Sequence, residues 1–113
     1  MRAGEEGVRL TAGDLGAALG ERATLVQFST AFCRPCRATR QVLGEVAAMV
    51  RGVAAVEVDA ESHLGLVRRL GISGTPTVLV LDATGREVRR AAGLPRKVDV
   101  IAALGEVVRA PGG

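Results

Sequence analysis

The most informative stretch of this sequence is VQFSTAFCRPC, residues 26–36. The apolar and β-branched residues over 23–30 are typical of a central strand. They lead directly to Cys33 and Cys36, and Pro35 suits the first turn of a helix, where its missing amide hydrogen is not needed. We therefore predict a strand-to-helix junction with Cys33 at the N-terminus of the helix.

These positions favour dithiol chemistry. At a helix N-terminus, unpaired backbone amides and the helix dipole stabilise a thiolate and lower the pKa of Cys33, and Arg34 adds a positive charge. Cys36 lies one turn further on nearly the same face, so it can attack a mixed disulfide formed at Cys33. We predict that Cys33 is the catalytic nucleophile and Cys36 the resolving thiol.

Other roles for the pair have less support. A structural zinc site needs four ligands, and His63 is the single histidine in the chain, so we expect no metal. Covalent haem attachment needs a histidine directly after Cys36, where Arg37 stands. An iron–sulfur cluster shared by two chains has no supporting feature. Two inert cysteines stay an open alternative, because cysteine often serves as a small buried hydrophobe.

The hydrophobic period switches between two and 3.6 along the chain, which is typical of an α/β protein. We expect strands over 7–10, 23–30, 53–59, 77–81 and 86–92, helices over 11–20, 34–50, 62–70 and 95–108, and a tail over 110–113. The strand over 53–59 is expected to be buried. This order, β-α-β-α-β-α-β-β-α, predicts a mixed central β-sheet with helices on both faces.

Local signals also predict helix ends and buried faces. Thr11 followed by Asp14 resembles a helix-capping start, Ser62 can cap the third helix, and Gly71 can end it. In the two longer helices, apolar spacing predicts these core-facing residues: Val42, Val46, Met49, Val50, Val98, Ile101, Leu104 and Val108.

Length and composition limit the class of protein. The 113 residues fit one compact domain, 1–113, and 48% of them are hydrophobic. The net charge is +3, but basic and acidic residues are interleaved and aromatic residues make up only 2%, so we expect no nucleic-acid binding. No apolar run reaches the roughly 18 residues of a membrane span, and the first ten residues contain two glutamates where a secretory signal needs an apolar core. We expect a cytoplasmic monomer, in a compartment where a cysteine pair more often serves catalysis, redox sensing or metal binding than crosslinking.

Residues 26–36, together with Gly74-Thr75-Pro76-Thr77, resemble the thioredoxin family. The resemblance runs from about Leu10 to Val108 in element order and includes Gly93 after the last strand. It implies a thioredoxin fold, a cis proline at position 76, protein disulfides as substrates, and no bound cofactor, with electrons coming from a separate reductase. Thr75 would offer its backbone to a substrate like an added strand. The resemblance implies a flat, mostly apolar docking surface; the expected substrate-binding residues are Phe32, Arg34, Pro35, Ile72, Gly74, Thr75, Pro76 and Gly93.

The chain departs from the family pattern beside the cysteines. Ser29 and Phe32 stand where family members commonly have tryptophan, and Arg34 stands where they have glycine. Gln27 replaces a buried acid that transfers a proton for the resolving thiol, and a lysine that often accompanies this acid would fall near Ala55. Glutamine cannot exchange a proton near neutral pH. We therefore expect water or Cys33 to deprotonate Cys36, slower oxidation of the dithiol, and a more oxidising disulfide.

These sequence features are compatible with three functions. The first is the reduction, or less readily the oxidation, of disulfides in other proteins. The second is a binding module with weak redox turnover, which Gln27 favours; the third is a dedicated redox partner of one enzyme, recognised through Arg34. Arg34, Arg37 and Arg40 recur every three residues, so they form either a basic rim for acidic partners or a solvated helix face.

Overall fold

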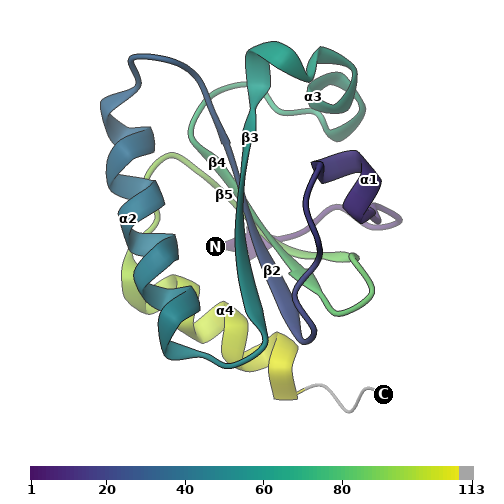
Figure 1. The fold of residues 1–113 in the computed structure, drawn as a ribbon, viewed down its shortest axis with the longest axis vertical. Helices are drawn as coiled ribbons and strands as arrows, with labels where there is room; N and C mark the ends of the chain where they lie inside the picture. The colour runs from purple at the N-terminus through teal and green to yellow at the C-terminus, as the bar shows by residue number, and fades with distance from the viewer. Residues whose placement is uncertain (110–113) are drawn as a thin grey trace.

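The computed structural model describes residues 1–109 (Figure 1), so the expected tail over 110–113 lies outside the described residues. The strands are β1 (Arg2–Ala3), β2 (Ala23–Ser29), β3 (Val53–Asp59), β4 (Thr77–Asp82) and β5 (Glu87–Ala92). The helices are α1 (Ala12–Leu15), α2 (Arg34–Met49), α3 (Leu64–Leu70) and α4 (Lys97–Arg109), and a 3-10 turn over Ala60–Ser62 precedes α3. Among these helices, none is long and apolar enough to cross a membrane.

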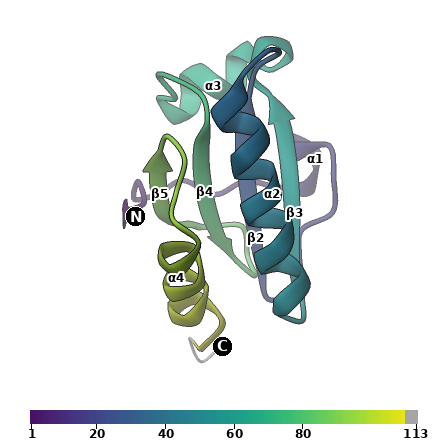
Figure 2. The same cartoon turned by 90° about the vertical axis from the view of Figure 1, so that its left-hand side faces the viewer.

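The strands form one mixed sheet in the order β1-β5-β4-β2-β3. Strands β2 and β3 are parallel, and the other neighbouring pairs are antiparallel. Helices α2 and α4 cover one face, and α1 and α3 lie on the other (Figures 1 and 2). The predicted α/β class, with a mixed sheet between helices, is confirmed.

Strand β2 is buried along its whole length, as a central strand should be. Successive side chains of a strand point to opposite faces, so Leu25 joins the core beneath α2 and α4 while Val26 and Phe28 join the core beneath α1 and α3. This burial on both faces holds the end of β2, and therefore the start of α2, in a fixed position.

Two strand predictions need correction. The expected strand over 7–10 is wrong: β1 lies earlier, and Arg9 makes only an isolated bridge with Arg86. Strand β3 has the predicted bounds but is not a buried strand, since only Val58 is buried. The reason is its place at the edge of the sheet, where one side has no neighbouring strand.

The helix ends follow local chemistry in part. Thr11 caps α1 through the expected capping box with Asp14, but α1 ends at Leu15 because Gly16 adopts the left-handed conformation at φ 68°. Gly71 ends α3 in the same conformation, as predicted. Ser62 does not cap α3; its hydroxyl donates to Asp59 instead.

Helix burial differs from the prediction at three positions. Met49 is 61% exposed, and Val98 and Ile101 of α4 are also exposed. The buried side of α4 consists of Val100, Ala103, Leu104 and Val107. This helix is apolar on several sides, so its spacing alone allows more than one buried face, and packing against β2, β4 and α2 selects one.

Candidate active site

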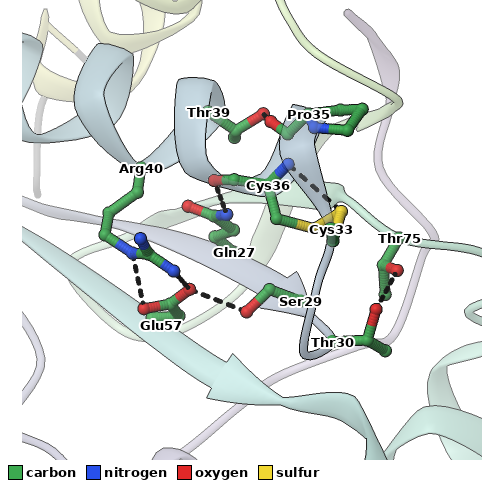
Figure 3. A network of polar contacts seen from close by, with 10 residues as sticks. All are labelled: Gln27, Ser29, Thr30, Cys33, Pro35, Cys36, Thr39, Arg40, Glu57 and Thr75. Carbon is green, nitrogen blue, oxygen red and sulfur yellow. Dashed lines mark hydrogen bonds and ion pairs between the residues drawn. A yellow bond between two sulfur atoms is a disulfide. The ribbon is translucent and has the colours of Figure 1, made fainter.

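The two cysteines lie where β2 leads into α2 (Figure 3). Cys33 is the N-cap residue of α2, and its Sγ accepts a hydrogen bond from the backbone N–H of Cys36 at 3.1 Å. The two residues form a disulfide, with their Cα atoms 5.2 Å apart. Cys33 is partly exposed, whereas Cys36 is 1% exposed. The predicted strand-to-helix junction is confirmed, and it leaves one sulfur accessible while the other is shielded.

The surroundings of Cys33 are electropositive. The first turn of α2 contains no acidic residue, so nothing there offsets the positive end of the helix dipole. Arg34 and Arg37 are exposed, and their guanidinium groups have no hydrogen-bond or ion-pair partner among the residues that the structure describes. Both effects favour an anion at this end of the helix.

A second segment, from the loop before β4, completes the site. The Thr75–Pro76 peptide bond is cis, as the resemblance implies. The N–H of Gly93 donates to the carbonyl of Pro76 at 2.8 Å, and the hydroxyls of Thr75 and Thr30 lie 3.1 Å apart, which joins this loop to the end of β2. Neither the N–H nor the C=O of Thr75 has a hydrogen-bond partner within residues 1–109. This short backbone edge can therefore pair with another chain.

Five of the eight expected docking residues line one of two pockets: Phe32 and Arg34 line the first, and Ile72, Gly74 and Thr75 line the second. The basic pocket, about 390 Å³, is lined by Thr30, Ala31, Phe32, Cys33, Arg34, Arg37 and Arg40. The apolar pocket, about 260 Å³, is lined by Thr30, Ala60, Glu61, Leu64, Val67, Ile72, Ser73, Gly74 and Thr75. Thr30 therefore separates the two. The expected flat, mostly apolar docking surface stays a prediction: three arginines line the basic pocket beside Cys33, whereas the apolar pocket contains Leu64, Val67 and Ile72.

The other expected docking residues differ in accessibility. Phe32 is fully exposed, with a left-handed backbone at φ 61°, and Pro35 is exposed beside it. Ile72 is only 9% exposed and lines the apolar pocket. Pro76 is buried and so contributes little to the exposed surface of the site. Gly93 is partly exposed next to Pro76.

Gln27 lies beneath the first turn of α2. It is 2% exposed, and its Nε2 donates to the backbone carbonyl of Cys36 at 2.7 Å. The side chain thus anchors the helix to the central strand. An amide at this position holds the helix but supplies no titratable group.

A polar network beside Gln27 connects α2 to β3 (Figure 3). The guanidinium of Arg40 donates to both carboxylate oxygens of Glu57, at 2.9 and 2.6 Å, and the hydroxyl of Ser29 donates to Glu57 at 2.7 Å. The bonds from Arg40 lower the pKa of Glu57 below its usual range, and the bond from Ser29 acts in the same direction, while partial burial opposes both. Glu57 is therefore a carboxylate near neutral pH.

The strand register locates this network. Gln27 pairs with Glu57, whereas Ala55 pairs with Leu25. Ala55, where the resemblance places a companion lysine, lines the same small pocket as Gln27, Arg40 and Glu57. It brings no charge there, and an acid, Glu57, occupies the position paired with Gln27. No local signal identifies Glu57 as the partner of Gln27, because the register of two parallel strands is decided only when the sheet forms.

Sequence reasoning also missed Thr30, which lines both pockets and contacts Thr75. No local pattern marks a threonine as the meeting point of two loops. His63, for which the sequence suggested no role, is exposed, with Nδ1 2.9 Å from the carbonyl oxygen of Asp59. Across the described chain, no three His, Cys, Asp or Glu side chains are grouped closely enough to hold a metal ion.

Comparison with known proteins agrees with this architecture. The family described as a thioredoxin-like domain matches residues 16–107. The chain is a member of the thioredoxin family. A thioredoxin of Chlamydia caviae is 34% identical over 77 residues, which cover 68% of this chain and 74% of that protein. A thioredoxin of Alicyclobacillus acidocaldarius is 32% identical over 91 residues, which cover 80% of this chain and 86% of the relative.

The thioredoxin fold is also found by structural comparison. A mutant thioredoxin from Halobacterium salinarum superposes with a TM-score of 0.71 at 20% sequence identity, covering 79% of this chain and 77% of that one. Membership of the thioredoxin family, together with a cysteine pair at the start of α2, indicates a thiol–disulfide oxidoreductase.

Proposed function

We propose that this thioredoxin family member reduces disulfides in other proteins through its Cys33–Cys36 dithiol. The observation that carries the proposal is the unequal exposure of the two sulfurs at one helix N-terminus, with Cys33 accessible and Cys36 shielded. An accessible sulfur stabilised as a thiolate can attack, and a shielded neighbour can wait to resolve the product.

The reaction proceeds in two exchanges. The thiolate of Cys33 attacks one sulfur of the substrate disulfide, so a bond between Cys33 and that sulfur forms, the substrate bond breaks, and the other substrate sulfur leaves as a thiolate. Cys36 then loses its proton and attacks Cys33, forming the Cys33–Cys36 disulfide and releasing the second substrate thiolate. Two electrons pass to the substrate, and its two thiolates take up protons from water.

The remaining residues have supporting roles in this proposal. The backbone of Thr75 pairs with the substrate polypeptide, and Phe32, Pro35 and Gly93 contact it around the dithiol. Because Gln27 cannot accept a proton and Cys33 is by then bound in the mixed disulfide, water takes the proton of Cys36. No cofactor is required; a separate reductase, or a low-molecular-weight thiol, restores the dithiol. A cytoplasmic, monomeric protein stays a prediction from the sequence.

The proposal is tested by measuring reduction of a protein disulfide with a purified thioredoxin reductase and NADPH. Wild type should turn over many times faster than Cys33→Ser or Cys36→Ser, because each variant lacks half of the dithiol. The Cys36→Ser variant should also retain substrates on Cys33 as mixed disulfides, detected by mass spectrometry without reductant. Equal rates for wild type and both variants would refute the oxidoreductase function and leave the binding module as the better hypothesis.

The binding module is the second candidate because of Gln27. Its bond to the Cys36 carbonyl stabilises the helix start without helping proton transfer. A partner that binds equally well to the oxidised protein, the reduced protein and Cys33→Ser would favour this second function.

A further inference from the structure

The basic pocket has positive charge that the chain itself does not neutralise. Arg40 is occupied by Glu57, which is also bound by Ser29. Arg34 and Arg37 line the same pocket beside Cys33, and their guanidinium groups have no partner within residues 1–109. With the N-terminal end of α2 at the same place, this pocket attracts an anion, and a planar guanidinium fits a carboxylate through two parallel hydrogen bonds.

The shape of the surface indicates that the anion belongs to a polypeptide. Within the described residues, the N–H and C=O of Thr75 are unpaired, and its side chain contacts Thr30, the residue shared by the basic and apolar pockets. A chain that pairs with Thr75 would pass between these pockets. Successive side chains of an extended chain alternate in direction, so one can enter the apolar pocket and another can approach Arg34 and Arg37.

We propose that the preferred substrates are polypeptide disulfides that carry Asp or Glu within a few residues of the attacked cysteine, and that Arg34 and Arg37 bind this carboxylate. The inference rests on the proposed reduction of disulfides and adds a substrate class to it. The two exchange reactions are unchanged, because the arginines bind the substrate and take no part in electron transfer.

The test compares two peptide substrates, each with one disulfide. They are identical except that one has Glu and the other Gln beside the attacked cysteine. The rate constant for their reduction is measured with reduced wild type, with Arg34→Gln/Arg37→Gln, and with Arg51→Gln. Arg51 is a matched control: it is an exposed arginine beyond the far end of α2, and its guanidinium has no partner in the described chain, since only its backbone carbonyl accepts a bond, from Arg22. Reduction by dithiothreitol corrects for any intrinsic difference between the two peptides.

We expect wild type and Arg51→Gln to prefer the Glu peptide by about tenfold at low ionic strength, as electrostatic attraction allows. The preference should shrink towards one as salt rises, because ions screen charges beyond about 10 Å at 0.1 M. The double variant Arg34→Gln/Arg37→Gln should lose most of the preference for the Glu peptide. A ratio of Glu to Gln rates is used because it is insensitive to any change in Cys33 reactivity that the loss of Arg34 causes.

The possible results distinguish a failure of the acidic preference from a failure of the proposed disulfide reduction. If wild type reduces both peptides at the same corrected rate, the acidic preference is wrong while disulfide reduction stands. If wild type reduces neither peptide faster than Cys33→Ser does, the proposed function itself fails. If 3,3′-dithiodipropionate is preferred over its diamide as strongly as the Glu peptide is over the Gln peptide, the assignment to a polypeptide is overturned in favour of a small anionic disulfide.

Discussion

Gln27 occupies the position where the resemblance implies a buried acid, and its environment suits an amide. Its Nε2 faces the carbonyl oxygen of Cys36 at 2.7 Å, and the side chain is 2% exposed. A carboxylate at this position would bring two acceptors together in a buried place, which is unfavourable. The amide therefore contributes to stability while it removes a proton acceptor from the site.

Replacing Gln27 by Glu tests both effects. We expect the free energy of unfolding to fall by about 1–3 kcal/mol near neutral pH, because the donated bond to Cys36 is lost. Burial raises the pKa of the introduced carboxyl, so it can accept the proton of Cys36, and oxidation of the dithiol should become faster. Urea unfolding measures the free energy of unfolding, and stopped-flow kinetics measure the rate of dithiol oxidation.

The matched control is Gln27→Leu, which removes the same bond without adding an acid. It should be destabilised without faster oxidation. If Gln27→Leu oxidises as fast as Gln27→Glu, proton transfer is not the cause.

Phe32 shows a second effect at the scale of one residue. A bulky side chain at φ 61° is conformationally unfavourable, and its full exposure means that no packing compensates for it. Local sequence preferences would not select this conformation. It arises because the chain must turn from the end of β2 into the first turn of α2 within a few residues.

Strand β3 and helix α2 are joined at the scale of secondary structure by the Arg40–Glu57–Ser29 network. The pKa of Glu57 is lowered in the folded protein by the bonds from Arg40, so folding favours its ionised form. Its stabilising contribution is present above the ordinary carboxyl value of 4.5 and is lost as the pH falls through the lower, folded pKa.

This pH dependence predicts how Glu57→Gln changes the stability of the protein in acid. In urea unfolding, wild type should lose stability on acidification below pH 4.5, and Glu57→Gln should lose less, since a group that no longer titrates cannot contribute. Part of the loss should remain, because the pKa values of Asp14, Asp59, Asp82, Asp99 and Glu45 are also lowered.

Glu6→Gln is the control, since Glu6 is exposed and has no side-chain partner in the described part of the chain. Identical acid profiles for Glu57→Gln and wild type would contradict the assignment.

A buried ion pair connects distant parts of the whole molecule. Arg90 on β5 donates to Glu87 at 2.8 and 2.7 Å and to the carbonyl of Leu70, at the end of α3, at 2.8 Å. Glu87 also accepts from the backbone N–H of Glu5, in the N-terminal segment. The bonds to Glu87 raise the pKa of Arg90, and both side chains are almost fully buried. Three segments therefore depend on one pair of charges.

Removing one charge should be costly. We expect Arg90→Met to lower the free energy of unfolding by about 3–5 kcal/mol, because it leaves Glu87 buried without a cation. The double variant Glu87→Met/Arg90→Met should be less destabilised than Arg90→Met alone, since no buried charge remains. Urea midpoints give both values. A single variant within about 0.5 kcal/mol of wild type would show that water or rearrangement satisfies Glu87.

The accuracy of sequence reasoning differed between short-range and long-range features. The junction at Cys33, the capping box at Thr11 and the helix end at Gly71 depend on a few adjacent residues, and the structure agrees with them. The exposure of Met49, the edge position of β3 and the pairing of Gln27 with Glu57 depend on strand order and helix packing. Several arrangements satisfy the same hydrophobic spacing, so these features needed the fold.

The amino-acid sequence by itself determined the chemical core of this thioredoxin family member: two cysteines at a helix start, with an amide where an acid is common. These are local properties, because backbone conformation around Cys33 depends on the neighbouring strand residues and on Pro35. Only the tertiary structure decided what surrounds them. Thr75 lies in the loop before β4 and contacts Thr30, and the register of β3 places Glu57 beside Gln27. Of the three arginines that line the basic pocket, Arg40 is bound by Glu57, whereas the guanidinium groups of Arg34 and Arg37 have no partner in the described chain. Contacts between residues far apart in the chain follow from the order and register of the strands, which no single segment specifies.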